Sequence, residues 1–294
     1  MPSGVPDLTV DGGEPRGGGR RVTVIGPPSL SLSSLFGSVR KLAHYRDLLH
    51  TLSVHRVRVR YKQSALGIAW AIIQPLSLML IYTLIFSLVA KVPSRGMPYA
   101  VFAYAALVPW TMFANALTNA SNSLVSHSQL VTKVYFPREI LPVTYVAAAL
   151  FDLLIASTVL VGMMIYYRVG VNANVLYVAP VVLLLSLFTT AVALMLSALQ
   201  VRFRDIGVAM PLLLQLWMFA TPVIYPLDAV PGGLRPLYVL NPMVGIVENF
   251  RRAVLEGAPP DFGSLGISAL VTLALLPCAY VYFKRADSTV ADVI

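Results

Sequence analysis

The chain has 294 residues, of which 57% are hydrophobic and only 12% are charged, and its formal net charge at pH 7 is +9. Soluble domains usually carry about 25% charged residues, so this composition excludes a large soluble domain and indicates a protein that crosses a membrane several times. We attribute the excess cations to the ends of membrane spans rather than to nucleic-acid binding. The single cysteine, Cys278, excludes an internal disulfide, and we expect it to be buried.

The N-terminal part of the chain changes character near residue 38. Residues 1–37 are rich in glycine and proline, which predicts a disordered cytoplasmic tail. Within residues 38–62, the positions of Leu42, Tyr45 and Leu49 follow the spacing of a helix face. We therefore expect an amphipathic helix here that lies along the membrane surface.

The stretch at residues 60–75, RYKQSALGIAWAIIQP, marks where the chain enters the membrane. Four cations lie between residues 56 and 62, and no charged residue follows Lys62 until Lys91. A helix needs about 20 apolar residues to cross a bilayer, and cations beside a span tend to stay in the cytoplasm. A first span should therefore leave the cytoplasm at this junction.

The remaining apolar runs predict an all-α membrane protein with six transmembrane helices in a domain at residues 63–285. The expected spans are about 65–90, 99–119, 140–167, 175–200, 206–226 and 262–283. Residues 120–139 are rich in Asn and Ser and should lie outside the membrane, and residues 286–294 should form a second cytoplasmic tail. The only charged residue within a predicted span is Asp152.

The distribution of cations predicts the orientation. With six spans and a cytoplasmic N-terminus, 16 of the 22 Lys and Arg residues lie inside and six lie outside. This asymmetry favours a multi-pass protein of the cytoplasmic (inner) membrane with both termini in the cytoplasm.

Residues 227–261, on the outer side, are too polar to span the membrane and too apolar for a plain loop. Asn241 followed by Pro242 is a typical helix start. Glu248 and Arg252, and Arg252 and Glu256, have the spacing of ion pairs on one helix face. We expect a short helical hairpin that dips back toward the outer leaflet before the last span.

Six stretches together resemble the permease subunit of an ABC-2 type exporter, in the branch that exports polysaccharides such as O-antigen, capsule or teichoic acid. They run from about Arg60 to Lys284 and include RYKQSALGIAWAIIQP at 60–75, LVPWTMFANAL at 107–117, LVTKVYFPREILP at 130–142, SAL-VRFRDI at 197–206, QLWMFATPVIYP at 215–226 and LNPMVGIVENFRRA at 240–253.

The resemblance implies a homodimer with one channel along the dimer axis and two copies of a separate ABC ATPase subunit on the cytoplasmic side. It implies that the segment before the first span is an interface helix and that residues 120–139 contain the helix that couples to the ATPase. The outer hairpin would help to gate the channel. The substrate would be a polysaccharide linked to a lipid pyrophosphate. The residues we expect in the outer gate are Asn241, Pro242, Glu248, Phe250 and Arg252.

The residues themselves agree with a permease that is not an enzyme. No G-x-x-x-x-G-K-[ST] motif is present, so this sequence offers no phosphate-binding loop for ATP. A transporter driven by an ion gradient usually has several ionisable groups in the membrane, and only one is predicted here, which favours a partner ATPase. We expect no cofactor, no metal site and no catalytic residue. Two alternatives are an ABC-2 permease for drugs or lipids and, less favoured, a membrane enzyme acting on polyprenyl-linked glycans.

Aromatic rings stack on the CH faces of sugars, so aromatic residues of the spans are candidates for a channel lining. Belts at the membrane interface and packing within the bundle are the alternative explanation for each of them. The candidates are Trp70, Tyr82, Phe86, Trp110, Phe113, Trp217, Phe219 and Tyr225.

Asp152 has two interpretations, because an acid in a span must be paired or must face water. It either accepts hydrogen bonds within the bundle, for instance from Ser or Thr of a neighbouring span, or it lies in the substrate path. We favour the structural role, because it is the only acid in a predicted span.

The segment at residues 130–138, LVTKVYFPR, combines apolar and aromatic side chains with cations, which is typical of a docking patch. Pro137 separates it from the third span, so a short helix here can press into a cleft of the ATPase. A segment lying under lipid headgroups without a partner is the alternative. The expected coupling residues are Leu130, Lys133, Val134, Tyr135, Phe136 and Arg138.

The docking hypothesis makes a first prediction. The double substitution Tyr135→Ala and Phe136→Ala should leave the permease folded and dimeric, but should weaken ATPase binding or uncouple ATP hydrolysis from export, because it removes the apolar anchors of the patch. Co-purification of the ATPase and glycan export would be measured in the same cells, and wild-type values of both would refute the assignment.

Overall fold

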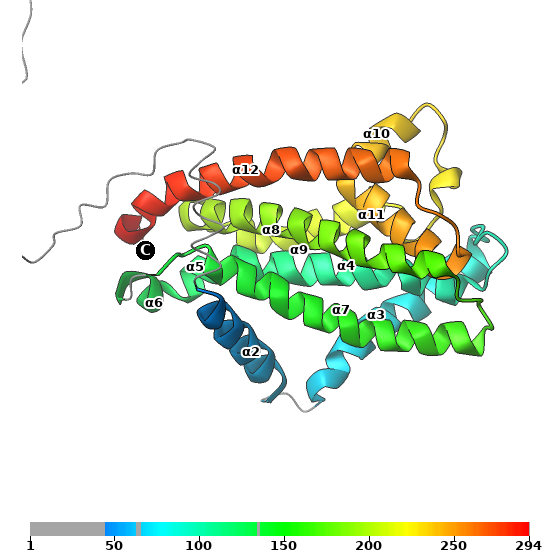
Figure 1. Cartoon of the computed structure of the whole chain (residues 1–294), viewed down its shortest axis with the longest axis horizontal. Helices are drawn as coiled ribbons and strands as arrows, with labels where there is room; N and C mark the ends of the chain where they lie inside the picture. Colours follow the sequence, from blue (N-terminus) through cyan, green and yellow to red (C-terminus); the bar gives the residue numbers. More distant parts are fainter. Residues whose placement is uncertain (1–44, 63–65, 134–135, 294) are drawn as a thin grey trace, which may run out of the picture.

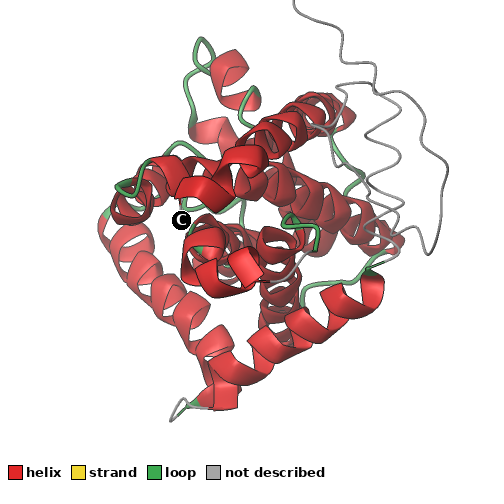
Figure 2. Cartoon of the chain, turned by 90° about the vertical axis from the view of Figure 1, so that its left-hand side faces the viewer, coloured by secondary structure: helices red, strands yellow, loops and turns green. Residues whose placement is uncertain are grey.

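The computed structural model describes residues 45–62, 66–133 and 136–293. These residues form helices joined by loops, and no strand occurs among them, as Figure 2 shows from the end of the bundle that carries the C-terminus. The expected all-helical membrane fold is therefore confirmed. The tail predicted at residues 1–37 and the start of the predicted interface helix lie outside the described residues.

Five helices are long and apolar enough to cross a membrane, and a sixth apolar helix is shorter. The five are Gly67–Val89, Tyr99–Ser121, Ile140–Tyr166, Ala173–Arg202 and Phe262–Asp287, and the shorter one is Ile206–Phe219. They correspond in order to the six predicted spans. Figure 1 shows α2, α5, α6 and the end of α12 at one end of the bundle and α10 and α11 at the opposite end.

The centre of the bundle is α4 (Tyr99–Ser121), which contacts α3 (Trp70–Tyr82), α7 (Ile140–Tyr166), α8 (Val178–Arg202) and α9 (Ile206–Phe219). In its most apolar window 83% of the residues are buried within the subunit, against 6% for the first span. Ala103, Ala105 and Ala106 let neighbouring backbones approach α4 closely. The second span is thus enclosed by protein, whereas the first offers an apolar outer face.

The segment before the first span is a helix, α2 (Arg46–Lys62), that packs on α7. The Arg56 guanidinium lies 3.6 Å from the centre of the Tyr145 ring, and its Nε donates to Thr144 Oγ1 at 2.6 Å. Further along, the Tyr61 hydroxyl donates to Asp152. Polar contacts therefore hold α2 against the third span in addition to its apolar residues.

The fifth predicted span, 206–226, is wrong at its outer end. Helix α9 stops at Phe219 after 14 residues, which gives about 21 Å at 1.5 Å per residue, less than a bilayer core of about 30 Å. The chain then turns through Thr221, Pro222 and Val223, all buried. Irregular backbone is tolerated at membrane depth where protein covers it, and here the outer hairpin supplies that cover.

The outer hairpin contains Leu227–Ala229, α10 (Arg235–Val239), α11 (Pro242–Arg251) and a wider turn at Arg252–Glu256. The predicted cap is present, because the Asn241 side chain accepts a hydrogen bond from the Met243 amide. All ten residues of α11 are buried, so this helix is an internal part of the subunit rather than an amphipathic surface helix.

The last helix, α12 (Phe262–Val293), continues beyond the predicted end of the span at residue 283. Cys278 lies on this helix and is exposed, so the expectation that it is buried is wrong. Cys278 lies in an apolar run of nearly uniform hydrophobicity, so the sequence pattern does not distinguish the exposed face of this helix from the buried one.

Helices α11 and α12 approach each other at Gly245, which generates a second prediction. A Cβ placed there would lie 2.2 Å from Ser268 Oγ and 2.5 Å from the Ser264 carbonyl oxygen. Gly245→Ala should therefore force the helices apart and destabilise the subunit by about 1–3 kcal/mol. The measurement is the thermal unfolding midpoint of the purified protein in detergent.

The matched control is Gly266→Ala on α12, where an added Cβ meets nothing within 4 Å. Alanine favours a helix over glycine by about 1 kcal/mol, so this control should be neutral or stabilising. Equal midpoints for the two variants would contradict the close contact at Gly245.

Candidate functional site

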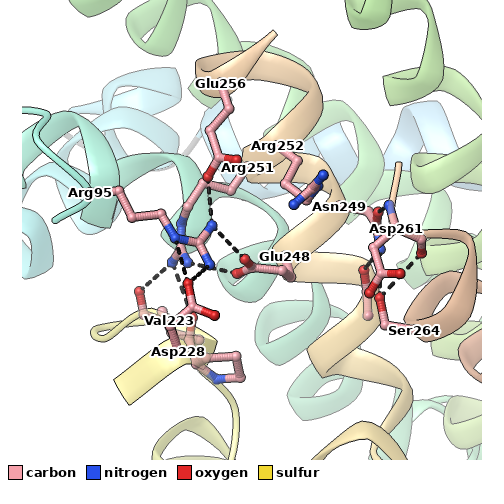
Figure 3. Close-up of polar contacts among 12 residues, drawn as sticks. Arg95, Val223, Asp228, Glu248, Asn249, Arg251, Arg252, Glu256, Asp261 and Ser264 are labelled. Carbon is pink, nitrogen blue, oxygen red and sulfur yellow. Dashed lines mark hydrogen bonds and ion pairs between the residues drawn. The ribbon is translucent and has the colours of Figure 1, made fainter. Parts of the chain in front are cut away.

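The outer end of the subunit contains an ion network formed by Arg95, Asp228, Glu248, Arg251 and Glu256, which we call the outer ion network (Figure 3). Arg95 comes from the loop between the first two spans, Asp228 from the start of the hairpin, and the other three from the end of α11 and the turn after it. The network thus joins three segments that are far apart in the sequence.

Arg251 is the most buried member, with its side chain fully enclosed. Its guanidinium pairs with Glu248 at 3.1 Å, donates to the Pro222 and Val223 carbonyl oxygens at 3.0 Å each, and lies 3.8 Å from the centre of the Phe102 ring. Burial lowers the pKa of Arg251 to about 10, because the nearby Glu248 offsets only part of the desolvation. The group remains charged at neutral pH.

Arg95 connects the loop to the hairpin. Its guanidinium pairs with Glu248 at 2.7 Å and with Asp228 and Glu256 at 2.6 Å each. Burial alone would lower the pKa of Arg95, but these carboxylates outweigh it and the pKa is raised. The backbone of Arg95 has a φ of 53°, a left-handed conformation that costs about 1–2 kcal/mol for a residue with a Cβ, and its three ion pairs hold it there.

The ion pairs predicted for Arg252 are wrong. Glu248 pairs with Arg95 and Arg251, and Glu256 pairs with Arg95. Arg252 instead donates to the Pro259 carbonyl oxygen at 3.2–3.3 Å. Helix spacing allows Glu248 to pair with either Arg251 at i+3 or Arg252 at i+4. The burial of Arg251 beside Glu248 determines that the i+3 pair forms.

A second polar contact fixes α11 to the start of α12. Asn249 donates to Ser264 Oγ at 3.2 Å, and its side-chain oxygen accepts from the Asp261 amide at 2.6 Å (Figure 3). The same side chain donates to the Gly245 carbonyl oxygen at 2.7 Å. Asn249 is fully buried, so its polar atoms are satisfied by these contacts alone.

The predicted outer-gate residues are therefore largely buried in this conformation. Phe250 and Pro242 lie in the interior with Glu248, whereas Asn241 and Arg252 are half-buried. Next to Asn241 the surface forms a cavity of about 540 Å³, lined by Leu216, Trp217, Ala220, Leu237, Tyr238, Asn241 and Pro242. Trp217 Nε1 donates to Asn241 Oδ1 at 3.1 Å, which ties the end of α9 to the hairpin.

The eight candidate channel aromatics do not share one surface. Trp110 and Phe113 lie in the core, where Phe113 stacks on Phe188 at 5.7 Å and meets Trp217 edge-on at 5.0 Å between ring centres. Trp70 and Phe219 are 50% and 46% exposed. The other four are half-buried: Tyr82, Phe86, Trp217 and Tyr225. In this conformation the core pair contacts neighbouring helices and does not reach the surface.

The cytoplasmic connection contains α5 (Ser123–Ser126) and α6 (Ser128–Lys133). We call residues 130–139 the coupling segment. Lys133 is exposed, Leu130 is half-buried, and Val134 and Tyr135 lie outside the described residues. Phe136 is buried in a cluster with Ile140, Leu141 and Phe283, so the expectation that it is an exposed anchor of a docking patch is wrong. The Phe136→Ala half of the first prediction should therefore lower the stability of the subunit, and only Tyr135→Ala still tests docking.

Two ion pairs of the coupling segment were not foreseen from the sequence. Lys284 Nζ lies 2.6 Å from Glu139 Oε2, and Arg138 Nη1 lies 3.0 Å from Asp287 Oδ1. Arg138 also donates to the Asp287 carbonyl oxygen at 2.8 Å. The partners are more than 140 residues apart in the chain, so no spacing rule connects them.

Asp152 lies on α7 and is 8% exposed. It accepts a hydrogen bond from the Tyr61 hydroxyl of α2, so this partner comes from the helix before the first span rather than from a Ser or Thr of a neighbouring span. Among the residues that the structure describes, no group of three or more His, Cys, Asp or Glu side chains could hold a metal ion.

A bundle of five long apolar helices with a sixth, shorter one and a buried outer hairpin defines a multi-span α-helical membrane protein. Residues 48–255 match the family model of the ABC-2 type transporter. The chain therefore belongs to the ABC-2 type transporter family, as the resemblance predicted. This membership implies a membrane context and a partner ATPase.

The chain is also similar to curated proteins over most of its length. It is 32% identical over 258 residues to the O-antigen export system permease protein RfbA of Myxococcus xanthus, covering 87% of this chain and 98% of the relative. Identity to RfbA of Klebsiella pneumoniae is 28% over 217 residues, covering 74% and 83%. Identity to the polysialic acid transport protein KpsM of Escherichia coli is 26% over 244 residues, covering 81% and 93%.

The outer ion network generates a third prediction. Glu248→Ala should destabilise the subunit by about 3–5 kcal/mol, because it leaves the buried Arg251 guanidinium without its carboxylate. The thermal unfolding midpoint in detergent would fall accordingly. Arg252→Ala is the control, since it removes a partly exposed contact with one carbonyl group. A midpoint for Glu248→Ala as high as that of the control would show that the pair with Arg251 contributes little.

Proposed function

We propose that the chain is the permease subunit of an ATP-driven exporter that moves a lipid-linked polysaccharide across the cytoplasmic membrane. The observation that carries this proposal is the similarity, along nearly the whole chain, to permeases named for O-antigen export and to a polysialic acid transport protein. The family match covers residues 48–255, and the similarity to RfbA of Myxococcus xanthus covers 87% of this chain and 98% of that relative, so the proposal rests on most of the chain rather than on one motif.

The packing of the subunit supports a homodimer with the channel between the two copies. Residues 101–113 of α4 are all buried, so side chains fill the centre of the subunit where a path would otherwise run. In contrast, α3 and α9 carry exposed apolar and aromatic side chains, among them Leu80, Leu212 and Leu216. A polymer would then pass along such an outer face, enclosed by the second copy.

Exposure narrows the channel lining that we propose. Trp70 on α3 and Phe219 on α9 present rings at the subunit surface, where CH faces of sugars can stack on them. Tyr82, Phe86, Trp217 and Tyr225 are half-buried and complete the proposed lining. The buried Trp110 and Phe113 are left out, because their rings are covered by neighbouring helices.

The energy for transport would come from two copies of the partner ATPase at the cytoplasmic end. The proposed orientation, with both termini in the cytoplasm, is supported by the position of α5, α6 and the end of α12 at one end of the bundle (Figure 1). Here Lys133 is exposed at the end of α6 and is available for docking. The outer hairpin, at the opposite end, would open and close the exit.

The proposal predicts the phenotype of a deletion. Cells lacking the chain should lose the surface glycan and accumulate lipid-linked polymer on the cytoplasmic side, because polymer synthesis continues while its exit is closed. Surface glycan and lipid-linked polymer would be quantified in the same cultures. Re-expression of the chain with a functional partner ATPase should restore export, whereas re-expression with a hydrolysis-deficient partner should not. Normal surface glycan in the deletion strain would refute the polysaccharide substrate.

A further inference from the structure

We propose that α12 is the mechanical link between the coupling segment and the outer hairpin, and that Lys284 and Asp287 are positioning residues that fix its cytoplasmic end. This inference rests on the proposed export function, because it assigns the route by which the ATPase would open the exit. It follows from two sets of contacts at opposite ends of one helix.

The cytoplasmic joint is formed by consecutive residues of the coupling segment and one turn of α12. Glu139 pairs with Lys284 and Arg138 with Asp287, and Lys284 and Asp287 also approach each other at 3.7 Å. Residues three apart on a helix share a face, so the two cations and two carboxylates alternate across this contact. The four side chains are between 7% and 23% exposed, which reduces screening by solvent compared with a surface ion pair.

Apolar packing reinforces the cytoplasmic joint. Phe283, the residue before Lys284, is buried in the same cluster as Phe136, Ile140 and Leu141. The coupling segment is therefore held to α12 both by this apolar cluster and by the two ion pairs. A displacement of the segment should move the end of α12 with it, because packed interiors are not continuously deformable.

The outer joint leaves equally little freedom between α12 and α11. Gly245 has no side chain, so the two helices approach closely here. A Cβ added at this position would lie only 2.2 Å from Ser268 Oγ. Asn249 bonds to Ser264 and to the Asp261 amide. Helix α11 is in turn fixed to the loop after the first span through the outer ion network. Movement of α12 should thus reach the hairpin.

Between its joints α12 is a continuous helix that contains Pro277 and packs along α8, and Figure 1 shows it running along most of the bundle. From Ser264 to Asp287 the rise is about 35 Å at 1.5 Å per residue. The backbone hydrogen bonds of its turns make a helix stiff along its axis. One of these bonds is missing in α12 at Pro277, which has no N–H to donate, but the chain stays helical through this position. It can therefore carry an axial shift or rotation from the coupling segment to the hairpin.

The competing route is α7, which follows the coupling segment directly in the chain. Its outer end leads into the segment at 167–174, where Asn172 and Asn174 donate to the Gly257 carbonyl oxygen at 3.3 and 2.5 Å. These contacts are made by side chains that are partly or largely exposed. The α12 route is favoured because its outer contacts are buried and involve α11 itself. Asn174→Ala interrupts the α7 route and serves as the matched control.

The test measures movement of the hairpin and does not require the glycan. In a Cys278→Ser background, which removes the only cysteine of the sequence, Leu240→Cys places a thiol at a hairpin position that is 58% exposed. The permease–ATPase complex in nanodiscs is labelled with a maleimide, without nucleotide and with ATP plus vanadate. We expect the two labelling rates to differ by about threefold or more, on the order of 0.65 kcal/mol in accessibility.

Asp287→Arg places a cation beside Arg138 and should bring the ratio of the two rates close to one while the complex stays assembled and hydrolyses ATP. The exchange Arg138→Asp with Asp287→Arg recreates the pair and should restore the ratio, which a merely destabilising change would not allow. Asn174→Ala should leave the ratio unchanged. If Asp287→Arg does not assemble, Asp287→Ala decides by the same readout.

An unchanged ratio in the Asp287 variants, a ratio lost in Asn174→Ala, or equal rates in the parent protein would each overturn the inference. A failure of the polysaccharide proposal is distinguishable, because it would appear as normal surface glycan in the deletion strain and would leave the labelling ratios as they are.

Discussion

The buried guanidinium of Arg251 is the contact on which the outer half of the subunit depends. Burying a cation is unfavourable unless an opposite charge pairs with it and acceptors take up its hydrogen bonds. Here Glu248 neutralises the charge, and the carbonyl groups of Pro222 and Val223 accept hydrogen bonds from Nη2, whereas Nε has no hydrogen-bond partner. These carbonyl groups are available only because the fifth helix stops at Phe219. The break in that helix, the burial of α11 and the position of the Arg95 loop therefore all meet in one electrostatic arrangement.

The subunit combines a rigid centre with an apolar exterior. Helix α4 is buried throughout residues 101–113, and the residues that surround this part form one continuous core. The first and fifth helices lie at the periphery with exposed leucine and aromatic side chains. In a membrane such faces contact lipid or another copy of the chain. A transporter that moves a long polymer needs an interface that can change its width, and in the function we propose that interface is formed by the peripheral helices while the core stays packed.

Both ends of the subunit use the same device, a charged group paired across segments that are distant in sequence. At the outer end the pairs join the hairpin to the first loop, and at the cytoplasmic end they join the coupling segment to α12. Ion pairs of this kind are poor sources of net stability, but they specify geometry, because an unpaired partner is strongly unfavourable in a shielded site. This property suits elements that must keep their relation to each other while the subunit changes shape.

From the sequence alone one can predict the membrane class, the order and approximate position of six apolar helices, the capped start of α11 at Asn241 and the family. These features depend on local properties: hydrophobic length, capping chemistry and the order of short stretches along one chain. The position of α4 at the centre and the early end of the fifth helix become clear only in the folded chain. The same holds for the inward orientation of Phe113 and Phe136 and for the pairing of Glu248 with Arg251 rather than Arg252. In an apolar helix every face looks alike to a periodicity argument, so the buried face is chosen by contacts with distant segments. Pairs such as Glu139 with Lys284 follow from the path of the whole chain, which local spacing does not encode.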